Sequence, residues 1–258
     1  TVYMSSLLQA IDRLATSPAA RTITRAWRGM SNLLIPNPCV LCAWDDAVQY
    51  QLCTRCTALL KEQHAQVVQA QDFADSLPLN TVTGMALPVF ASSFYTPEMS
   101  KLLLRFKDHQ RVNAAGFLRP IVYRTLQHAA DTLGYPYYRL VPIPASGASM
   151  RKRGYNPVTA MLPKSVPPTM LYDAETLKTR WQLYNRSSHA GTGVQSRRDS
   201  SRKKFRVALR HNPAAEPVIL VDDVLTTGAT LAAATRTLES AGFDVVAAVV
   251  VATVVPRN

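Results

Sequence analysis

The sequence predicts an α/β protein: a parallel sheet flanked by helices, preceded by a small N-terminal module that holds every cysteine of the chain. Near the C-terminus, residues 218–221 and 245–254 are apolar runs, and residues 229–241 between them have the spacing of an amphipathic helix. Strands that are apolar on both faces are typical of parallel sheets with helices on both sides. The chain has 258 residues, 47% of them hydrophobic, so it can bury such a core.

The chain is predicted to comprise three parts: a helical extension over residues 1–35, a four-cysteine module over residues 36–60, and an α/β domain over residues 61–258. Pro36 and Pro38 end the helical pattern of the extension. The sequence contains no export signal and no apolar run near the roughly 20 residues that a membrane span needs. We therefore expect a cytoplasmic protein.

The cysteines form two Cys-x2-Cys pairs within 18 residues, at Cys39, Cys42, Cys53 and Cys56. Each pair can present two thiolates from one tight turn, and two such turns complete a tetrahedron around a metal ion. The pattern predicts a structural zinc ion, because four thiolates leave no open position for a catalytic water. A redox-active Cys-x2-Cys pair is the alternative, which the presence of two pairs disfavours.

Hydrophobic spacing and turn residues predict the elements between the cysteine module and the C-terminal strands. Helices are expected at residues 58–74, 99–109 and 117–133, short strand-like runs within 78–95, a strand at 139–144, a loop at 145–157, and a mobile basic segment at 186–204. Gly134 is placed to end the third helix. In the second helix, Lys107 is expected on the exposed face.

The predicted strand at residues 218–221 runs into two adjacent aspartates, Asp222 and Asp223. A turn of small and hydroxyl-bearing residues follows, made of Thr226, Thr227, Gly228, Ala229 and Thr230. Ligands of open parallel sheets bind beyond the carboxyl ends of the strands. The N–H groups, hydroxyls and helix dipole of the turn suit a phosphate, and the carboxylates suit the vicinal hydroxyls of a sugar. An ordinary N-capped helix would explain a threonine but not the acid pair.

The stretch VILVDDVLTTGAT resembles the phosphoribosyl-pyrophosphate (PRPP) signature of type I phosphoribosyltransferases. The resemblance implies a type I phosphoribosyltransferase-like fold. It also implies that Asp222 and Asp223 hold the ribose 2- and 3-hydroxyls, while the turn at residues 226–230 wraps the 5-phosphate. In this superfamily magnesium bridges the pyrophosphate, which leaves from C1 of the ribose, and the corresponding pyrophosphate loop is Pro144 to Ser149.

Other stretches resemble the ComF family, also called GntX-like: LVPIP followed by RKRGYNP, the four-cysteine module ahead of the domain, and the FK pair that ends at Lys107. A later family element corresponds to Gln195, Arg198 and Phe205, whereas Pro157 stands where the family usually has glutamine. The resemblance implies a role in natural competence, with handling of incoming single-stranded DNA and competence-machinery proteins as partners.

Basic charge is concentrated in one segment. The net charge is +12, and residues 148–210 contain 14 basic against 3 acidic residues. A polyanion partner and a solvated basic loop are both consistent with this charge. The same segment carries aromatic side chains that suit base stacking: Tyr155, Tyr172, Trp181, Tyr184 and Phe205. The candidate contacts for pyrophosphate or nucleic acid are Arg151, Lys152, Arg153 and Tyr155.

Three functions are compatible with these patterns. The first is a competence protein that binds PRPP and handles single-stranded DNA. The second is an active phosphoribosyltransferase that transfers ribose 5-phosphate to an unidentified base or amine in nucleotide metabolism, and the third is a nonenzymatic zinc-anchored assembly module. No segment marks an acceptor pocket, so catalysis is left open. The histidines, His64, His109, His128, His189 and His211, are scattered, and none is singled out as a general base.

Overall fold

A computed structural model describes residues 38–43, 49–79, 84–108, 112–179, 205–208 and 216–255. The chain divides into two compact units, residues 1–54 and 55–258. The predicted extension over residues 1–35 and the predicted mobile segment over 186–204 lie outside the described residues. In the described part of the chain, no helix is long and apolar enough to cross a membrane. The predicted boundaries of the three parts stay predictions.

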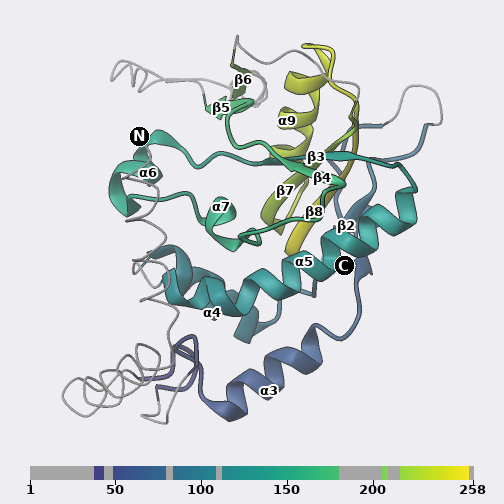
Figure 1. Cartoon of the computed structure of the whole chain (residues 1–258). Coiled ribbons are helices and arrows are strands. Elements are labelled where there is room, and N and C mark those ends of the chain that lie inside the picture. Colours follow the sequence, from purple (N-terminus) through teal and green to yellow (C-terminus); the bar gives the residue numbers. More distant parts are fainter. Residues whose placement is uncertain are drawn as a thin grey trace, which may run out of the picture. The chain divides into compact units, whose positions relative to one another are not determined.

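The larger unit is built on a mostly parallel sheet, in which the described strands have the order β1-β2-β8-β7-β3-β4 (Figure 1). These strands span Val68–Gln69 (β1), Val89–Ala91 (β2), Tyr138–Pro142 (β3), Met170–Tyr172 (β4), Val218–Leu225 (β7) and Val245–Thr253 (β8). β1 pairs antiparallel with β2, and the other neighbouring pairs are parallel. A separate antiparallel ribbon pairs β5 (Leu177–Thr179) with β6 (Phe205–Val207). The predicted α/β fold with a parallel sheet is confirmed.

Helices cover both faces of this sheet. On one face lies α9 (Ala229–Glu239), whose Leu231 and Leu238 share a buried cluster with Leu220 and Val250 of the central strands. On the opposite face lies α5 (Ala115–Leu133) (Figure 1). The strand residues that alternate with the cluster, such as Val249, are buried as well. Burial on both faces explains why the two C-terminal strands are apolar throughout.

The helices predicted at residues 99–109 and 117–133 agree with the structure, as does α9 within the predicted range 229–241. Helix α4 (Pro97–Asp108) buries its apolar stripe of Met99, Leu102, Leu103 and Phe106. It begins after Thr96, whose hydroxyl accepts a hydrogen bond from the Met99 amide at 3.2 Å. A 3-10 turn, η2 (Val112–Ala114), leads into α5, which ends as predicted at Gly134 with φ of 73°. Lys107 differs from its prediction: it is partly buried, because it forms an ion pair with Asp223 of β7.

The helix predicted at residues 58–74 is wrong in its second half. Helix α3 spans Thr54–Gln63 only, and it is followed by β1 and the 3-10 turn η1 (Gln71–Phe73). Val68 pairs with Ala91 across β1 and β2. The polar and apolar residues here do fit a helical spacing, but pairing at the sheet edge satisfies the backbone and decides the conformation.

The loop predicted at residues 145–157 is also wrong, because it contains helix α6 (Gly147–Arg153) and the start of helix α7 (Pro157–Met161). The Ser146 hydroxyl accepts a hydrogen bond from the Ser149 amide at 3.2 Å and begins α6. Gly154, with φ of 77°, ends it, and the Asn156 side chain accepts from the Val158 amide at 3.0 Å to begin α7. The small residues that indicated a loop are therefore the caps of two short helices.

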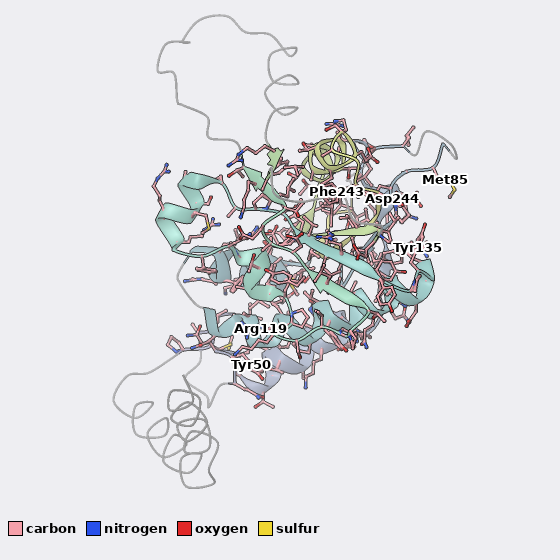
Figure 2. All side chains as sticks on the ribbon, turned by 45° about the horizontal axis from the view of Figure 1, so that its top comes forward. Tyr50, Met85, Arg119, Tyr135, Phe243 and Asp244 are labelled. Atoms are coloured by element: carbon pink, nitrogen blue, oxygen red, sulfur yellow. The ribbon has the colours of Figure 1, made fainter. Side chains whose placement is uncertain are left out.

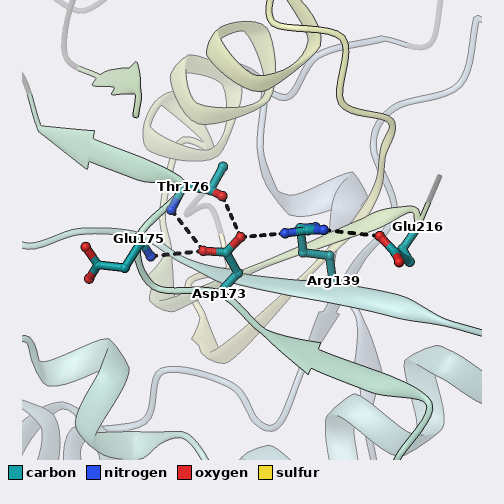
Figure 3. A network of polar contacts seen from close by, with 5 residues as sticks. All are labelled: Arg139, Asp173, Glu175, Thr176 and Glu216. Carbon is teal, nitrogen blue, oxygen red and sulfur yellow. Dashed lines mark hydrogen bonds and ion pairs between the residues drawn. The ribbon is translucent and has the colours of Figure 1, made fainter. Parts of the chain in front are cut away.

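A buried ion pair fastens the start of the β5–β6 ribbon to the sheet (Figure 3). Arg139 of β3 donates to the Asp173 carboxylate at 2.6 Å, and both side chains are almost fully buried. The same carboxylate accepts hydrogen bonds from the amides of Glu175 and Thr176 and from the Thr176 hydroxyl. Arg139 also reaches Glu216, just before β7, at 3.2 Å. One side chain thus links β3, β7 and the ribbon.

We predict that Asp173→Asn lowers the free energy of unfolding by about 2–4 kcal/mol at neutral pH, because it leaves the buried Arg139 guanidinium with only its more distant and more exposed partner, Glu216. Burial opposes ionisation of Asp173, but hydrogen bonds from Thr176 and Arg139 outweigh it and hold its pKa below the ordinary value of 3.8. The stabilisation is therefore present above about pH 4 and is lost as the pH falls through the lowered pKa. Urea unfolding across pH 2–7, roughly, measures it.

The matched control is Glu175→Gln, which breaks the exposed Glu175–Lys178 pair at 2.7 Å. We expect a change below about 0.5 kcal/mol for this control, since exposed pairs contribute little. Two results would contradict the role assigned to the network. One is an equal loss of unfolding free energy in the two variants, and the other is a fall in the stability of Asp173→Asn at acidic pH that matches the fall in the wild type.

Candidate functional site

The acid pair lies where the central strand β7 loses one of its two neighbours. The pairing of β3 with β7 ends at Pro142 opposite Val221, whereas β8 continues beside β7 as far as Leu225. The strand predicted to stop at residue 221 is therefore longer, because β8 still provides hydrogen-bond partners. Asp222 and Asp223 follow the last residue paired with β3, so one side of the strand opens at the carboxyl edge of the sheet.

The two aspartates have different surroundings. Asp222 is almost fully buried, and its carboxylate accepts a hydrogen bond from the Asp223 amide at 2.8 Å. Asp223 is more exposed and forms an ion pair with Lys107 of α4, with Nζ and Oδ2 2.7 Å apart. Because successive residues of a strand face opposite sides of the sheet, Asp222 is on the α9 side and Asp223 on the other. Only one of the two carboxylates therefore meets the lysine.

The turn after β7 delivers backbone N–H groups to the same edge. Thr226 and Thr227 are exposed, and Gly228 adopts a left-handed conformation with φ of 81° directly before α9. The N-terminal amides of a helix lack intrahelical acceptors, and here the Ala229 amide reaches only the Thr227 hydroxyl, at 3.4 Å. This end of α9, with Thr230 in its first turn, has the donors and the dipole direction that an anion requires.

Residues 74–77 pack against the turn that follows β7 and support it. The Ser76 amide donates to the Thr227 carbonyl at 2.9 Å, and a Cβ added at Gly228 would lie 2.9 Å from Leu77 Cδ2 and 3.3 Å from Ala74 Cβ. Gly228 thus satisfies two requirements at once, the left-handed φ and the close approach of the 74–77 segment. The sequence indicated the first requirement, but nothing in it indicated the second.

The segment after β3 reaches the same edge from the other side. The Ile143 amide donates to the Val221 carbonyl at 2.8 Å, so the predicted pyrophosphate loop, Pro144 to Ser149, starts beside the acid pair. Arg151 and Lys152 of α6 are exposed, and Arg153 is partly buried. These three basic residues share one short helix that the loop leads into.

Tyr155 and Asn156 of the RGYNP stretch make structural contacts. The Tyr155 hydroxyl donates to the Phe106 carbonyl at the end of α4, and the two rings lie 5.9 Å apart. The Asn156 side chain donates from Nδ2 to the Ile143 carbonyl at 3.2 Å. Tyr155 was predicted as a ligand contact, and that role is untested. Sequence reasoning missed Asn156, although its position before a proline is a recognisable helix-start signal.

The other predicted site residues either lie away from this edge of the sheet or are not among the described residues. Gln195 and Arg198 are not among the described residues, and Phe205 of β6 is buried. His64 is buried as well, and its Nδ1 lies 3.2 Å from the Ser92 carbonyl. Burial lowers the pKa of His64 to about 4, so the ring is neutral at physiological pH. These contacts assign His64 a packing role, and it is not placed against the acid pair.

A cavity lies at the opposite edge of the sheet, where β8 begins. Its volume is about 390 Å³, and its lining includes Met85, Tyr135 and Asp244, which lie on one side of the molecule in Figure 2. Val245, the first residue of β8, also lines it. Val245 pairs with Val218 at the start of β7, so the cavity and the acid pair lie at opposite ends of these two strands.

The four cysteines form a compact cluster that fits the predicted metal. Their sulfur atoms all lie within 4.8 Å of one another, and those of Cys42 and Cys53 are 3.7 Å apart. A tetrahedral zinc ion with Zn–S bonds of about 2.3 Å separates its sulfurs by about 3.8 Å, so the spacing agrees. Burial opposes the charged form of Cys39, but amide hydrogen bonds from Cys42 and Cys53 outweigh it and lower its pKa to about 7. A deprotonated thiolate is the form that binds zinc.

The phosphoribosyl transferase domain family matches residues 180–255, which include β7, α9 and β8 together with the acid pair and the turn. This segment of the chain is therefore similar to phosphoribosyl transferase domains. No curated protein matches the chain.

We predict that Gly228→Ala destabilises the protein more than Gly154→Ala. Both glycines have φ near 80°, so each alanine costs about 1–2 kcal/mol for the left-handed backbone. A Cβ at Gly154 meets nothing within 4 Å, whereas one at Gly228 meets Leu77, which adds roughly 1–3 kcal/mol. Urea unfolding of both variants measures the difference. Equal losses would mean that the 74–77 segment moves aside freely.

We predict that the purified protein contains one zinc ion per chain and that Cys42→Ser reduces this stoichiometry. Zinc should protect the four thiols from alkylation, and a strong chelator should make all of them reactive while releasing the metal. Elemental analysis measures the zinc content, and thiol titration counts the reactive cysteines. Ser93→Ala, outside the cysteine module, is the control. Four reactive thiols in the untreated protein would contradict the zinc site.

Proposed function

We propose that this protein binds PRPP, with magnesium, at the carboxyl edge of β7. One observation carries the proposal: an acid pair at an open strand end is followed at once by a turn of amides at the start of α9, inside the matched phosphoribosyltransferase segment. A sugar diol needs acceptors and its phosphate needs donors, and the chain supplies both within nine residues, 222–230.

The parts of PRPP suit different elements of this edge. The 5-phosphate suits the turn formed by Thr226, Thr227, Gly228, Ala229 and Thr230. The ribose hydroxyls suit Asp222 and Asp223, and the pyrophosphate suits the loop after β3 together with Arg151, Lys152 and Arg153. Magnesium prefers hard oxygen ligands, which carboxylates and a pyrophosphate provide, and when bound it would neutralise charge on the leaving group.

Two fuller functions extend this binding activity. In the first, a ComF-like competence protein handles incoming single-stranded DNA and uses the PRPP site for binding or regulation. In the second, the chain transfers ribose 5-phosphate to a base or amine. The first is favoured by the basic segment over residues 148–210, in which Arg151, Lys152 and Arg206 are exposed. The second is favoured by the complete acid pair and turn.

Within the described part of that segment, the aromatic side chains are not equivalent. Tyr172 is 39% exposed and is accessible for stacking, whereas Phe205 is 2% exposed and belongs to the core. Binding of single-stranded oligonucleotides should therefore depend mainly on charge. The expected signature is an affinity that falls steeply between about 50 and 200 mM salt. An affinity that is insensitive to salt would exclude the basic segment as the contact surface.

We predict that isothermal titration calorimetry detects PRPP binding by the wild type in the presence of magnesium, and that Asp222→Asn/Asp223→Asn weakens it by about 100-fold or more, because two charged acceptors are lost. The control is Asp244→Asn, which removes an exposed carboxylate at the opposite edge and should leave the affinity unchanged.

A wild type that does not bind PRPP would overturn the proposed site. The two fuller functions are separated by pyrophosphate release over a panel of bases and amines: release identifies a transferase, and binding without release favours the competence role. Loss of transformation in a deletion strain tests that role directly.

A further inference from the structure

We infer that Lys107 is a ligand-binding residue of the acid-pair site and that Tyr155 is the positioning residue that holds it there. The inference rests on the proposed PRPP site and extends it to helix α4, which lies outside the matched segment at residues 180–255. It also gives Tyr155 a role different from the direct ligand contact that its sequence neighbourhood predicts.

The ion pair between Lys107 and Asp223 is close and partly sheltered. Nζ lies 2.7 Å from Oδ2, and the two side chains are only 25% and 16% exposed. Helix α4 is fixed beneath it, because Met99, Leu102 and Phe106 are fully buried. The lysine is therefore presented to the strand end by a well-packed helix, and it is not a mobile surface side chain that happens to approach an acid.

The charge of the proposed ligand explains why a cation is needed at this point. Adjacent carboxylates repel the phosphate groups of a polyanion, and the repulsion between charges about 4–6 Å apart is substantial in a partly buried site. Lys107 neutralises one of the two carboxylates before the ligand arrives. An ammonium group has three N–H donors, so Lys107 can keep its bond to Asp223 and donate to a ligand oxygen as well.

Tyr155 holds the backbone that carries this lysine. Its hydroxyl donates to the carbonyl of Phe106, the residue directly before Lys107, and the rings of Tyr155 and Phe106 pack together. The carbonyls in the last turn of a helix lack intrahelical donors, so this bond satisfies one of them.

Asn156, the next residue, connects the same stretch to the sheet. It donates to the Ile143 carbonyl at 3.2 Å, and the Ile143 amide is bonded to Val221, directly before the acid pair. Two neighbouring residues thus tie the end of α4 and the end of β3 to one another. The distance from Lys107 to Asp223 depends on both ties.

The inference is tested by the affinity of the full chain for PRPP with magnesium, measured for Lys107→Met, Tyr155→Phe and the double variant. We expect Lys107→Met to weaken binding by about ten-fold, with a larger factor at low salt, since a charge-assisted contact is lost. Tyr155→Phe should weaken it by about three-fold. The double variant should be no weaker than Lys107→Met alone, because Tyr155 acts through the lysine.

Matched controls separate these effects from general damage. Lys101→Met removes an exposed lysine of the same helix, and Tyr137→Phe removes the hydroxyl of an exposed tyrosine just before β3; neither should change the affinity. Lys107→Arg keeps the charge and should recover most of the affinity that Lys107→Met loses. Thermal unfolding of every variant identifies any that is simply destabilised.

The outcomes decide between the inference and its alternatives. No PRPP binding by the wild type overturns the proposed function and this inference with it. Wild-type binding that Lys107→Met leaves unchanged overturns this inference alone. If the losses of affinity in Lys107→Met and Tyr155→Phe multiply in the double variant, Tyr155 contacts the ligand independently. That result overturns its positioning role.

Discussion

The structure depends on an unequal pairing of the central strand. β7 has two parallel neighbours up to Val221 and only β8 beyond it, so its last four residues have one open side. Charged residues tolerate this position because the sheet no longer encloses them there, while β8 still satisfies the backbone. The acid pair, the turn at Gly228 and the loop after β3 all meet at this edge because the pairing ends there.

Several elements brace the edge, and most come from distant parts of the sequence. The segment Ala74–Leu77 supports the turn, α4 supplies the lysine that pairs with Asp223, and Asn156 ties the loop region to Ile143. The buried Arg139–Asp173 pair performs a similar task for the β5–β6 ribbon. The proposed ligand site at the strand end is thus stabilised by contacts that lie outside the motif that defines it.

The sequence predicted the features that depend on local chemistry. The apolar C-terminal strands, the helix that follows the threonine turn, the cysteine spacing and the amphipathic α4 all have patterns that a single segment determines. It did not predict β1, because pairing at a sheet edge overrides a helical spacing, or the helices α6 and α7, whose caps resemble loop residues. The ion pair of Lys107 with Asp223 was also missed, since the two residues are far apart in the sequence and only the fold brings them together.

The position of β7 and β8 in the middle of the sheet limits how the matched segment can be studied. β8 lies between β2 and β7, and β7 lies between β8 and β3. A fragment restricted to residues 180–255 would lose both outer neighbours and expose two long, valine-rich edges, the kind of surface that aggregates. We therefore expect that the matched segment does not fold on its own, because the strands that cover its edges, β2 and β3, lie outside it.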